Sequence, residues 1–193
     1  ELLLCCYETL SKNNDLLGHY QQRFKNILVD EFQDTNEIQY QMIKLLSGAH
    51  GAAFVVGDDD QSIYRWRGAN SANMSRFQTE FVDTRVIKME QNYRSTKTIL
   101  AAANAVIANN DKRLEKTLWT SAEEGPQIKL VANYDEYEEA HNIIDTIQAK
   151  SKSVGLNNIA VLYRSNAQSR VIEEALLQQA IPYRVYGGFR FFD

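Results

Sequence analysis

Residues 27–36 read ILVDEFQDTN, an apolar run that ends in two neighbouring acids, Asp30 and Glu31. A short aliphatic run bounded by polar residues is typical of a buried strand. A helical pattern follows over residues 38–46, and a second apolar run occupies residues 53–56. This strand–helix–strand order predicts two parallel strands, and it places Asp30 and Glu31 at the carboxyl end of the first, where open α/β sheets bind ligands.

The same alternation continues along the chain. Further strands are expected at residues 86–87, 128–131, 159–163 and 183–186, and further helices at 70–77, 96–107, 136–149 and 168–179. The order predicts an α/β fold with parallel sheets flanked by helices. A seam near residues 89–91 divides it into two predicted domains, 1–89 and 90–193.

Composition excludes several classes of protein. The 193 residues are 44% apolar and 24% charged, which is typical of a globular chain, and no apolar run approaches the ~20 residues that cross a bilayer. The formal charge of −4 argues against a basic surface for nucleic acid as a whole, but it allows a local patch. Cys5 and Cys6 are adjacent and the only cysteines, so a disulfide framework is excluded and a reducing, cytoplasmic location is expected. The chain starts inside a helical pattern and stops just after an aromatic run, which predicts a fragment of a longer protein; natural ends are the alternative.

The two acids after the first strand have the chemistry of a phosphoryl-transfer site. One carboxylate can hold Mg²⁺ and its neighbour can polarise a water for in-line attack. Acids that simply point into solvent are the alternative reading of Asp30 and Glu31. The extended string with Gln33 and Asp34 is more specific than the acid pair alone.

A second motif, VVGDDDQSIYRWRGAN, covers residues 55–70. The three acids Asp58–Asp60 would repel one another unless a cation, a basic neighbour or solvent relieves them. Gln61 adds a neutral amide that can contact a phosphate. Tyr64–Arg67 alternates aromatic and basic residues, which suits base stacking and phosphate neutralisation, although a core position for Trp66 is the alternative.

The third motif, QNYRSTKTIL, covers residues 91–100. Ser95 or Thr96 can cap the helix that follows. Tyr93 offers a ring for stacking, and Arg94 offers a planar guanidinium that suits a phosphate group.

In their order and spacing, DEFQDTN, VGDDDQSIYRWRGA and QNYRS resemble motifs II, III and IV of superfamily 1 helicases of the UvrD/Rep/PcrA type. The later strings VLYRSNAQSRVIEEALL, IPYRVYGG and FRFFD resemble the second motor lobe of that family, so the similarity covers essentially the whole chain. The resemblance implies two partial RecA-like lobes of the P-loop NTPase class. It also implies an ATP-dependent, 3′-to-5′ DNA helicase of repair or replication, acting on single-stranded and partially duplex DNA at the bacterial nucleoid.

The resemblance implies a role for each matching residue. Asp30 would organise Mg²⁺, with Glu31 beside it as the general base. Gln61 would contact the γ-phosphate of ATP, Tyr93 would stack near the adenine, and Arg94 would reach the γ-phosphate across the interlobe cleft. The residues implied in DNA binding are Tyr64, Trp66, Arg67, Arg164 and Asn166. Residues Asp58–Asp60 would form a structural and coupling turn.

The sequence lacks one element of such a motor. No G-x-x-x-x-G-K-[ST] loop occurs among the 193 residues, so the isolated chain is expected to bind ATP poorly and to hydrolyse it negligibly. A non-catalytic single-stranded DNA-binding module is the alternative for the isolated chain. A metal-dependent nuclease built on Asp30, Glu31, Asp34 and residues 58–60 is a further alternative, and it predicts DNA cleavage without nucleotide.

Overall fold

The computed structural model describes residues 1–48, 52–110 and 116–186. The chain divides into two compact units, Glu1–Gln127 and Ile128–Asp193. This division lies further along the chain than the seam expected near residue 89, which stays a prediction.

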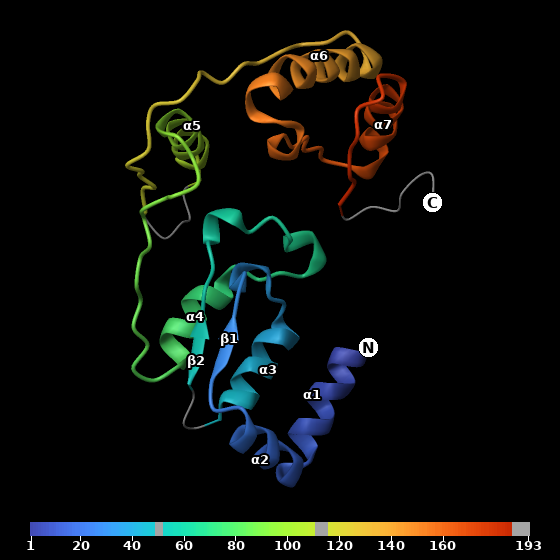
Figure 1. Cartoon of the computed structure of the whole chain (residues 1–193). Helices are drawn as coiled ribbons and strands as arrows, with labels where there is room; N and C mark the ends of the chain where they lie inside the picture. The colour runs from blue at the N-terminus through green and yellow to red at the C-terminus, as the bar shows by residue number, and fades with distance from the viewer. Residues whose placement is uncertain (49–51, 111–115, 187–193) are drawn as a thin grey trace. The chain divides into compact units, whose positions relative to one another are not determined.

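The first unit contains a small parallel sheet with helices beside it (Figure 1). Its helices and strands are α1 (Leu2–Lys12), α2 (Asn14–Arg23), β1 (Ile27–Val29), α3 (Glu37–Ser47), β2 (Ala53–Val55), α4 (Ala72–Glu80) and α5 (Lys97–Ile107). Short 3₁₀ turns interrupt its loops at η1 (Phe32–Asp34), η2 (Asp59–Gln61) and η3 (Arg65–Arg67).

Strands β1 and β2 pair in parallel, as the strand–helix–strand pattern predicts. Side chains alternate between the two faces of a strand, and here one face is buried. Leu28 and Phe54 are paired in register on the other face, where 74% and 59% of their surface is exposed. The residues that form the buried core or pack against it are Ile27, Val29, Phe32, Tyr40, Ile43, Ala53, Val55, Met74, Phe77 and Phe81. Within the residues that the structure describes, the sheet therefore packs against helices on one face only.

Helix α3 joins the two strands and begins with a capping box. The Asn36 side chain accepts a hydrogen bond from the Gln39 backbone, and the Gln39 side chain accepts one from the Asn36 backbone, both at 2.9 Å. This reciprocal pair satisfies two of the free N–H groups at the helix start. The helix ends at Gly48, whose φ of 60° is readily adopted only by glycine.

A charged cluster fixes α4 against α3. Arg76 donates hydrogen bonds to Glu37 at 2.6 Å and to Glu80 at 3.0 Å, and its guanidinium lies 4.4 Å from the ring centroid of Tyr40. Lys44 of α3 forms an ion pair with the same Glu80 at 2.8 Å. These contacts hold the pKa of Glu80 at about 2, mainly through the hydrogen bonds from Lys44 and Arg76.

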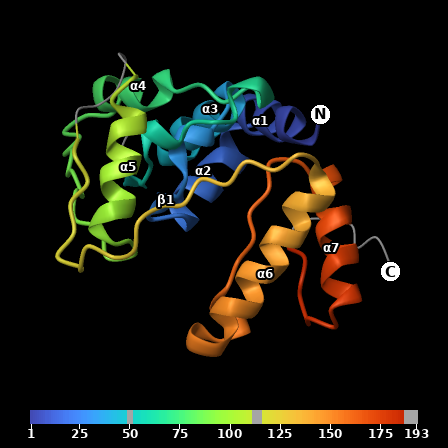
Figure 2. The same cartoon turned by 90° about the horizontal axis from the view of Figure 1, so that it is seen from above.

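The second unit packs two helices around one apolar core. It contains α6 (Glu136–Val154), η4 (Leu156–Asn158), η5 (Asn166–Gln168) and α7 (Ser169–Gln178). Helices α6 and α7 lie side by side in both views (Figures 1 and 2). The buried core residues are Ala140, Ile144, Ile147, Ile172 and Leu176. No helix among the described residues combines the length and apolar character needed to cross a membrane.

Several expected strands are not formed in the part of the chain that the structure describes. Residues 86–87 and 128–131 are extended but unpaired, and Leu130 is 98% exposed. Residues 159–163 and 183–186 are unpaired as well, although Ile159, Val161 and Tyr183 pack against the core between α6 and α7. The predictions of strands were wrong because a strand needs a hydrogen-bonded neighbour, and these segments have none among the described residues.

Candidate functional site

The acidic pair lies directly after β1, where the backbone takes an unusual conformation. Asp30 accepts a 2.9 Å hydrogen bond from the backbone N–H of Glu31 through Oδ1. Glu31 has φ 50° and ψ 44°, in the left-handed region that residues other than glycine seldom occupy. Both side chains are exposed. Such backbone strain persists only where the surroundings determine it, and it is concentrated at functional sites.

A groove of about 410 Å³ opens beside these acids, and its lining includes Asp30, Glu31 and Asp34. The Oδ1 atom of Asp34 is buried and has no hydrogen-bond partner among the described residues. Carboxylate oxygens are the ligands that Mg²⁺ prefers, usually together with water. The donor set therefore fits a magnesium ion, with Asp30 and Glu31 as the residues expected to hold it.

Gln33 connects the acidic pair to the loop after β2. Its Nε2 donates a 2.7 Å hydrogen bond to Glu31 Oε2, and its Oε1 accepts a 3.0 Å hydrogen bond from the backbone N–H of Asp58. Only 1% of Gln33 is exposed. Gly57 leaves room for it, since a Cβ atom at position 57 would lie 2.9 Å from Gln33 Oε1. One buried amide thus fixes a carboxylate on one strand end and the backbone of the other.

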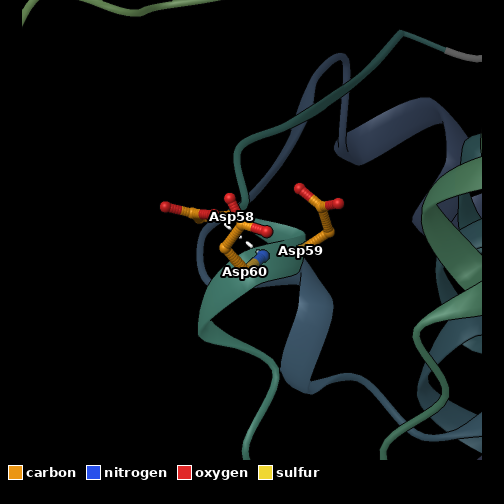
Figure 3. Close-up of side chains that lie close together, drawn as sticks. All are labelled: Asp58, Asp59 and Asp60. Atoms are coloured by element: carbon orange, nitrogen blue, oxygen red, sulfur yellow. Dashed lines mark hydrogen bonds between the residues drawn. The ribbon is translucent and has the colours of Figure 1, made fainter. Parts of the chain in front are cut away.

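The loop after β2 carries Gln61 on the short turn that begins at Asp58. Asp58 accepts hydrogen bonds from the backbone of Asp60 at 3.0 Å and from Gln61 Nε2 at 2.8 Å. Figure 3 shows the carboxylates of Asp58, Asp59 and Asp60 projecting from this short turn. A chain of hydrogen bonds therefore leads from Glu31 through Gln33 and Asp58 to Gln61.

Lys116 neutralises the three acids of this turn. Its Nζ forms an ion pair with Asp58, and it lies 3.0 Å from Asp59 and 3.4 Å from Asp60. Burial alone would raise the pKa of Asp58, but the hydrogen bonds from Lys116 and Gln61 outweigh it and hold that pKa below its usual value. Burial likewise would lower the pKa of Lys116, and its bonds to Asp58 and Asp59 raise it instead. The cluster has the ligand spacing of a metal site, but an ammonium group lies among its oxygens.

The segment that follows the acidic pair is joined to the segment that follows the aromatic and basic residues. Asn36 and Ala69 form an isolated antiparallel bridge. The backbone C=O of Thr35 accepts hydrogen bonds from the Asn70 backbone at 3.0 Å and from Asn73 Nδ2 at 3.1 Å. Asn73 is fully buried. The segment that carries the aromatic and basic residues is therefore fixed to the segment that carries the acids.

The aromatic and basic residues lie on the surface. Trp66 is 69% exposed and Tyr64 is 36% exposed, so neither belongs to the core. The Arg67 guanidinium lies 4.6 Å from the ring centroid of Trp66 and 5.0 Å from that of Tyr64. The three side chains form one exposed aromatic and cationic surface, which suits a single-stranded nucleic acid.

The third motif contributes two further candidate residues, Tyr93 and Arg94. Tyr93 is 82% exposed and donates a 2.8 Å hydrogen bond to Gln91. In the described part of the chain, neither Tyr93 nor Arg94 forms a hydrogen bond or ion pair with the acidic pair or Gln61. Thr96 occupies the cap position of α5 but makes no cap bond, and the Asn92 side chain instead accepts from two backbone N–H groups, including that of Arg94.

Arg164 and Asn166 belong to the second unit, on the loop before α7. Both are exposed. The backbone N–H of Arg164 donates to Gln168 Oε1 at 3.0 Å, and Ser165 and Gln168 form a capping box. This local bonding fixes the loop backbone and leaves both side chains at the surface.

Two residues of the site were not predicted to act there. Gln33 lies within the first motif but was assigned no role, and Lys116 lies outside all three motifs. The need for a positive neighbour at Asp58–Asp60 was a usable signal, but nothing local to the sequence points to a lysine 58 residues from Asp58.

The fold defines a mixed α/β protein whose parallel strands carry polar loops at their carboxyl ends. Within that class, the chain belongs to the UvrD-like helicase family. The UvrD-like helicase C-terminal domain matches residues 87–193, and the UvrD/REP helicase N-terminal domain matches residues 1–82.

Curated relatives match over the whole chain. It is 54% identical to DNA helicase II of Escherichia coli, 45% to a probable DNA helicase II homolog of Rickettsia conorii, and 44% to the ATP-dependent DNA helicase PcrA of Bacillus subtilis. Each alignment covers 100% of this chain but only 27%, 30% and 26% of the respective relative. The chain thus spans between a quarter and a third of their length.

Proposed function

We propose that this chain is the central section of an ATP-dependent, 3′-to-5′ DNA helicase. It would contain the late part of one RecA-like lobe, residues 1–89, and the early part of a second, residues 90–193. The proposed substrates are single-stranded and partially duplex DNA, in repair or replication at the bacterial nucleoid. Family membership and the relatives' names support this proposal.

The hydrogen-bond chain from Glu31 to Gln61 carries the proposal. Mg²⁺–ATP, when bound, supplies the phosphoryl group and the charge that polarises it. In this proposal Asp30, directly after β1, holds the metal. Glu31 accepts a proton from the attacking water, and the bond from Gln33 fixes its carboxylate for that step. Gln61 contacts the terminal phosphate through its amide. Its turn is joined to Glu31 by the hydrogen bonds through Asp58 and Gln33.

In this proposal the exposed surface formed by Tyr64, Trp66 and Arg67 binds single-stranded DNA. Bases stack on Trp66, with Tyr64 beside it, while Arg67 neutralises the backbone. Arg164 and Asn166 add strand contacts from the second lobe. The bonds of Thr35 to Asn70 and Asn73 connect this surface mechanically to the acidic loop.

The remaining ATP contacts come from elsewhere in the proposed motor. Tyr93 and Arg94 act from the second lobe, Tyr93 on the adenine and Arg94 on the γ-phosphate. The chain has no phosphate-binding loop of the Walker A type, so we propose that it hydrolyses ATP only as part of a longer protein.

Replacement of the general base tests the proposal. In the full-length protein, Glu31→Gln should lower DNA-stimulated ATP hydrolysis by about a hundredfold or more, because the amide cannot accept the proton. ATP affinity should change little. Glu8→Gln, which removes a carboxylate from an exposed ion pair with Lys12, is the matched control. ATPase activity of Glu31→Gln within severalfold of wild type would exclude the proposed base.

A non-catalytic single-stranded DNA-binding module is the second candidate, favoured by the 69% exposure of Trp66. It predicts oligo(dT) binding without any nucleotide effect. Oligo(dT) affinity that differs between the ADP-bound and ATP-analogue-bound protein supports the helicase, and equal affinities support the module. The nuclease alternative has less support, because Lys116 lies among the acids it needs for metal.

A further inference from the structure

Lys116 lies outside the three motifs, yet its Nζ contacts all three carboxylates of the acidic turn that holds Gln61. Its side chain is only 15% exposed, and the carboxylates of Asp59 and Asp60 are 14% and 10% exposed. Three acids in so little solvent would repel one another strongly without a cation. The ammonium group therefore determines whether this turn can keep its conformation.

The contact to Asp58 extends to Gln61. Lys116 bonds one carboxylate oxygen of Asp58, and Gln61 Nε2 donates to the other at 2.8 Å. The Asp58 backbone N–H donates to Gln33, which holds Glu31. Without the lysine, the Asp58 carboxylate would keep its bonds from the Asp60 backbone and Gln61, but repulsion from Asp59 and Asp60 would shift it and loosen the Gln61 amide.

The segment that follows Lys116 is joined to the third motif. The Trp119 backbone donates to the Glu90 C=O at 3.0 Å and accepts from the Asn92 N–H at 2.7 Å. Residues 116–119 therefore form one short connection between the acidic turn and the segment that carries Tyr93 and Arg94.

We propose that Lys116 is a positioning residue, which holds Gln61 in its phosphate-sensing orientation and ties that turn to the segment of Tyr93 and Arg94. This inference rests on the proposed function. Lys116 and the acidic turn both lie in the first compact unit, Glu1–Gln127, so the ion pair acts within that unit.

The test compares nucleotides that differ in the γ-phosphate. In the full-length protein, Lys116→Met should weaken the affinity for a non-hydrolysable ATP analogue by about tenfold, while ADP affinity stays within about twofold. DNA-stimulated ATPase activity should fall by about tenfold or more. Lys116→Arg keeps the charge and should restore both values to within about threefold of wild type.

The control and a second variant separate positioning from folding. Lys97→Met removes the same charge from an exposed ion pair with Glu124, and it should change none of these values. The double variant Lys116→Met/Asp59→Asn relieves the repulsion and should fold with wild-type thermal stability, yet retain the loss of analogue affinity. Equal losses for analogue and ADP, or wild-type analogue affinity in either variant, overturn the inference.

Different results would overturn the proposed function and the role of Lys116. If the wild-type protein shows no DNA-stimulated ATPase activity, or if Glu31→Gln keeps it, the motor itself is wrong. If Glu31→Gln abolishes hydrolysis and Lys116→Met behaves like Lys97→Met, only the role of Lys116 is wrong.

Discussion

Gln33 Nε2 donates a 2.7 Å hydrogen bond to Glu31 Oε2 from a position that is 1% exposed. A buried amide that donates to a carboxylate holds that group in one orientation, and its loss leaves polar atoms without partners. Glu31 itself lies in the left-handed backbone region. Together, the strained backbone and the buried amide fix the direction of this carboxylate before any ligand binds.

Replacement of Gln33 by glutamate should disrupt the site. The variant places an acceptor opposite Glu31 and repels its carboxylate, so we expect a loss of about 1–3 kcal/mol in folding stability. DNA-stimulated ATPase activity should fall by about tenfold or more. Gln41→Glu is the matched control, because Gln41 donates the same kind of bond to Glu37 at 2.7 Å outside the site. Equal effects of the two substitutions on ATPase activity would show that Gln33 does not orient Glu31 for catalysis.

Gly57→Ala should affect the same amide from the other side. A methyl group there would lie 2.9 Å from Gln33 Oε1 and 3.3 Å from Phe32 Cβ, so Gln33 must move. Such overpacking costs about 1–3 kcal/mol, which chemical unfolding measures. Gly18→Ala is the control, since a Cβ atom at position 18 meets nothing within 4 Å and alanine favours its helix. Wild-type stability and ATPase activity in Gly57→Ala would show that the contact with Gln33 is unimportant.

Local sequence predicts β1 and the acidic loop after it, but it does not predict the hydrogen bonds and ion pairs that join this loop to distant residues. The run at residues 27–29 and the acids after it predicted β1 and its loop, because β-branched residues and strand-end acids are local features. The bond from Gln33 to Asp58 joins residues 25 apart, and Lys116 approaches Asp58 from 58 residues away. The strand order predicts that β2 lies beside β1, but which side chains then meet depends on the packing of distant loops, which local sequence does not reveal.

The strand predictions failed for a related reason. Residues 159–163 have the period-2 burial of a strand, since Ile159 and Val161 pack toward the core and Leu162 is 94% exposed. Side-chain periodicity can be read from sequence, whereas the hydrogen-bonded neighbour that completes a strand is a property of the whole sheet.

Loss of the Trp66 ring should weaken DNA binding without unfolding the protein. Base stacking is worth about 1–3 kcal/mol, so Trp66→Ala should lower oligo(dT) affinity by about 5- to 150-fold. Fluorescence anisotropy of labelled oligo(dT) measures this loss. Trp119→Ala is the control, since Trp119 is 52% exposed and lies outside the aromatic surface. Unchanged affinity in Trp66→Ala would remove it as the stacking platform.

The Glu80 cluster predicts a pH dependence of stability. Hydrogen bonds from Lys44 and Arg76 lower the pKa of Glu80 from 4.5 to about 2. A carboxyl whose pKa is lower in the folded state stabilises the protein above its unfolded pKa, and this contribution is lost as pH falls from about 4.5 toward 2. Urea unfolding of wild type and Glu80→Gln should therefore differ most at pH 6 and less at pH 3. A difference that stays constant between these pH values contradicts this assignment.

A double-mutant cycle between Glu31 and Gln61, read as single-turnover ATP hydrolysis by the DNA-bound full-length protein, tests most directly whether the two residues act together. If the two residues act as one unit through Gln33 and Asp58, Glu31→Gln/Gln61→Ala should be no slower than the slower single variant, because residues of one catalytic unit are strongly non-additive. Rate losses that multiply, so that the double variant shows the product of the two single effects, would show that Glu31 and Gln61 work independently.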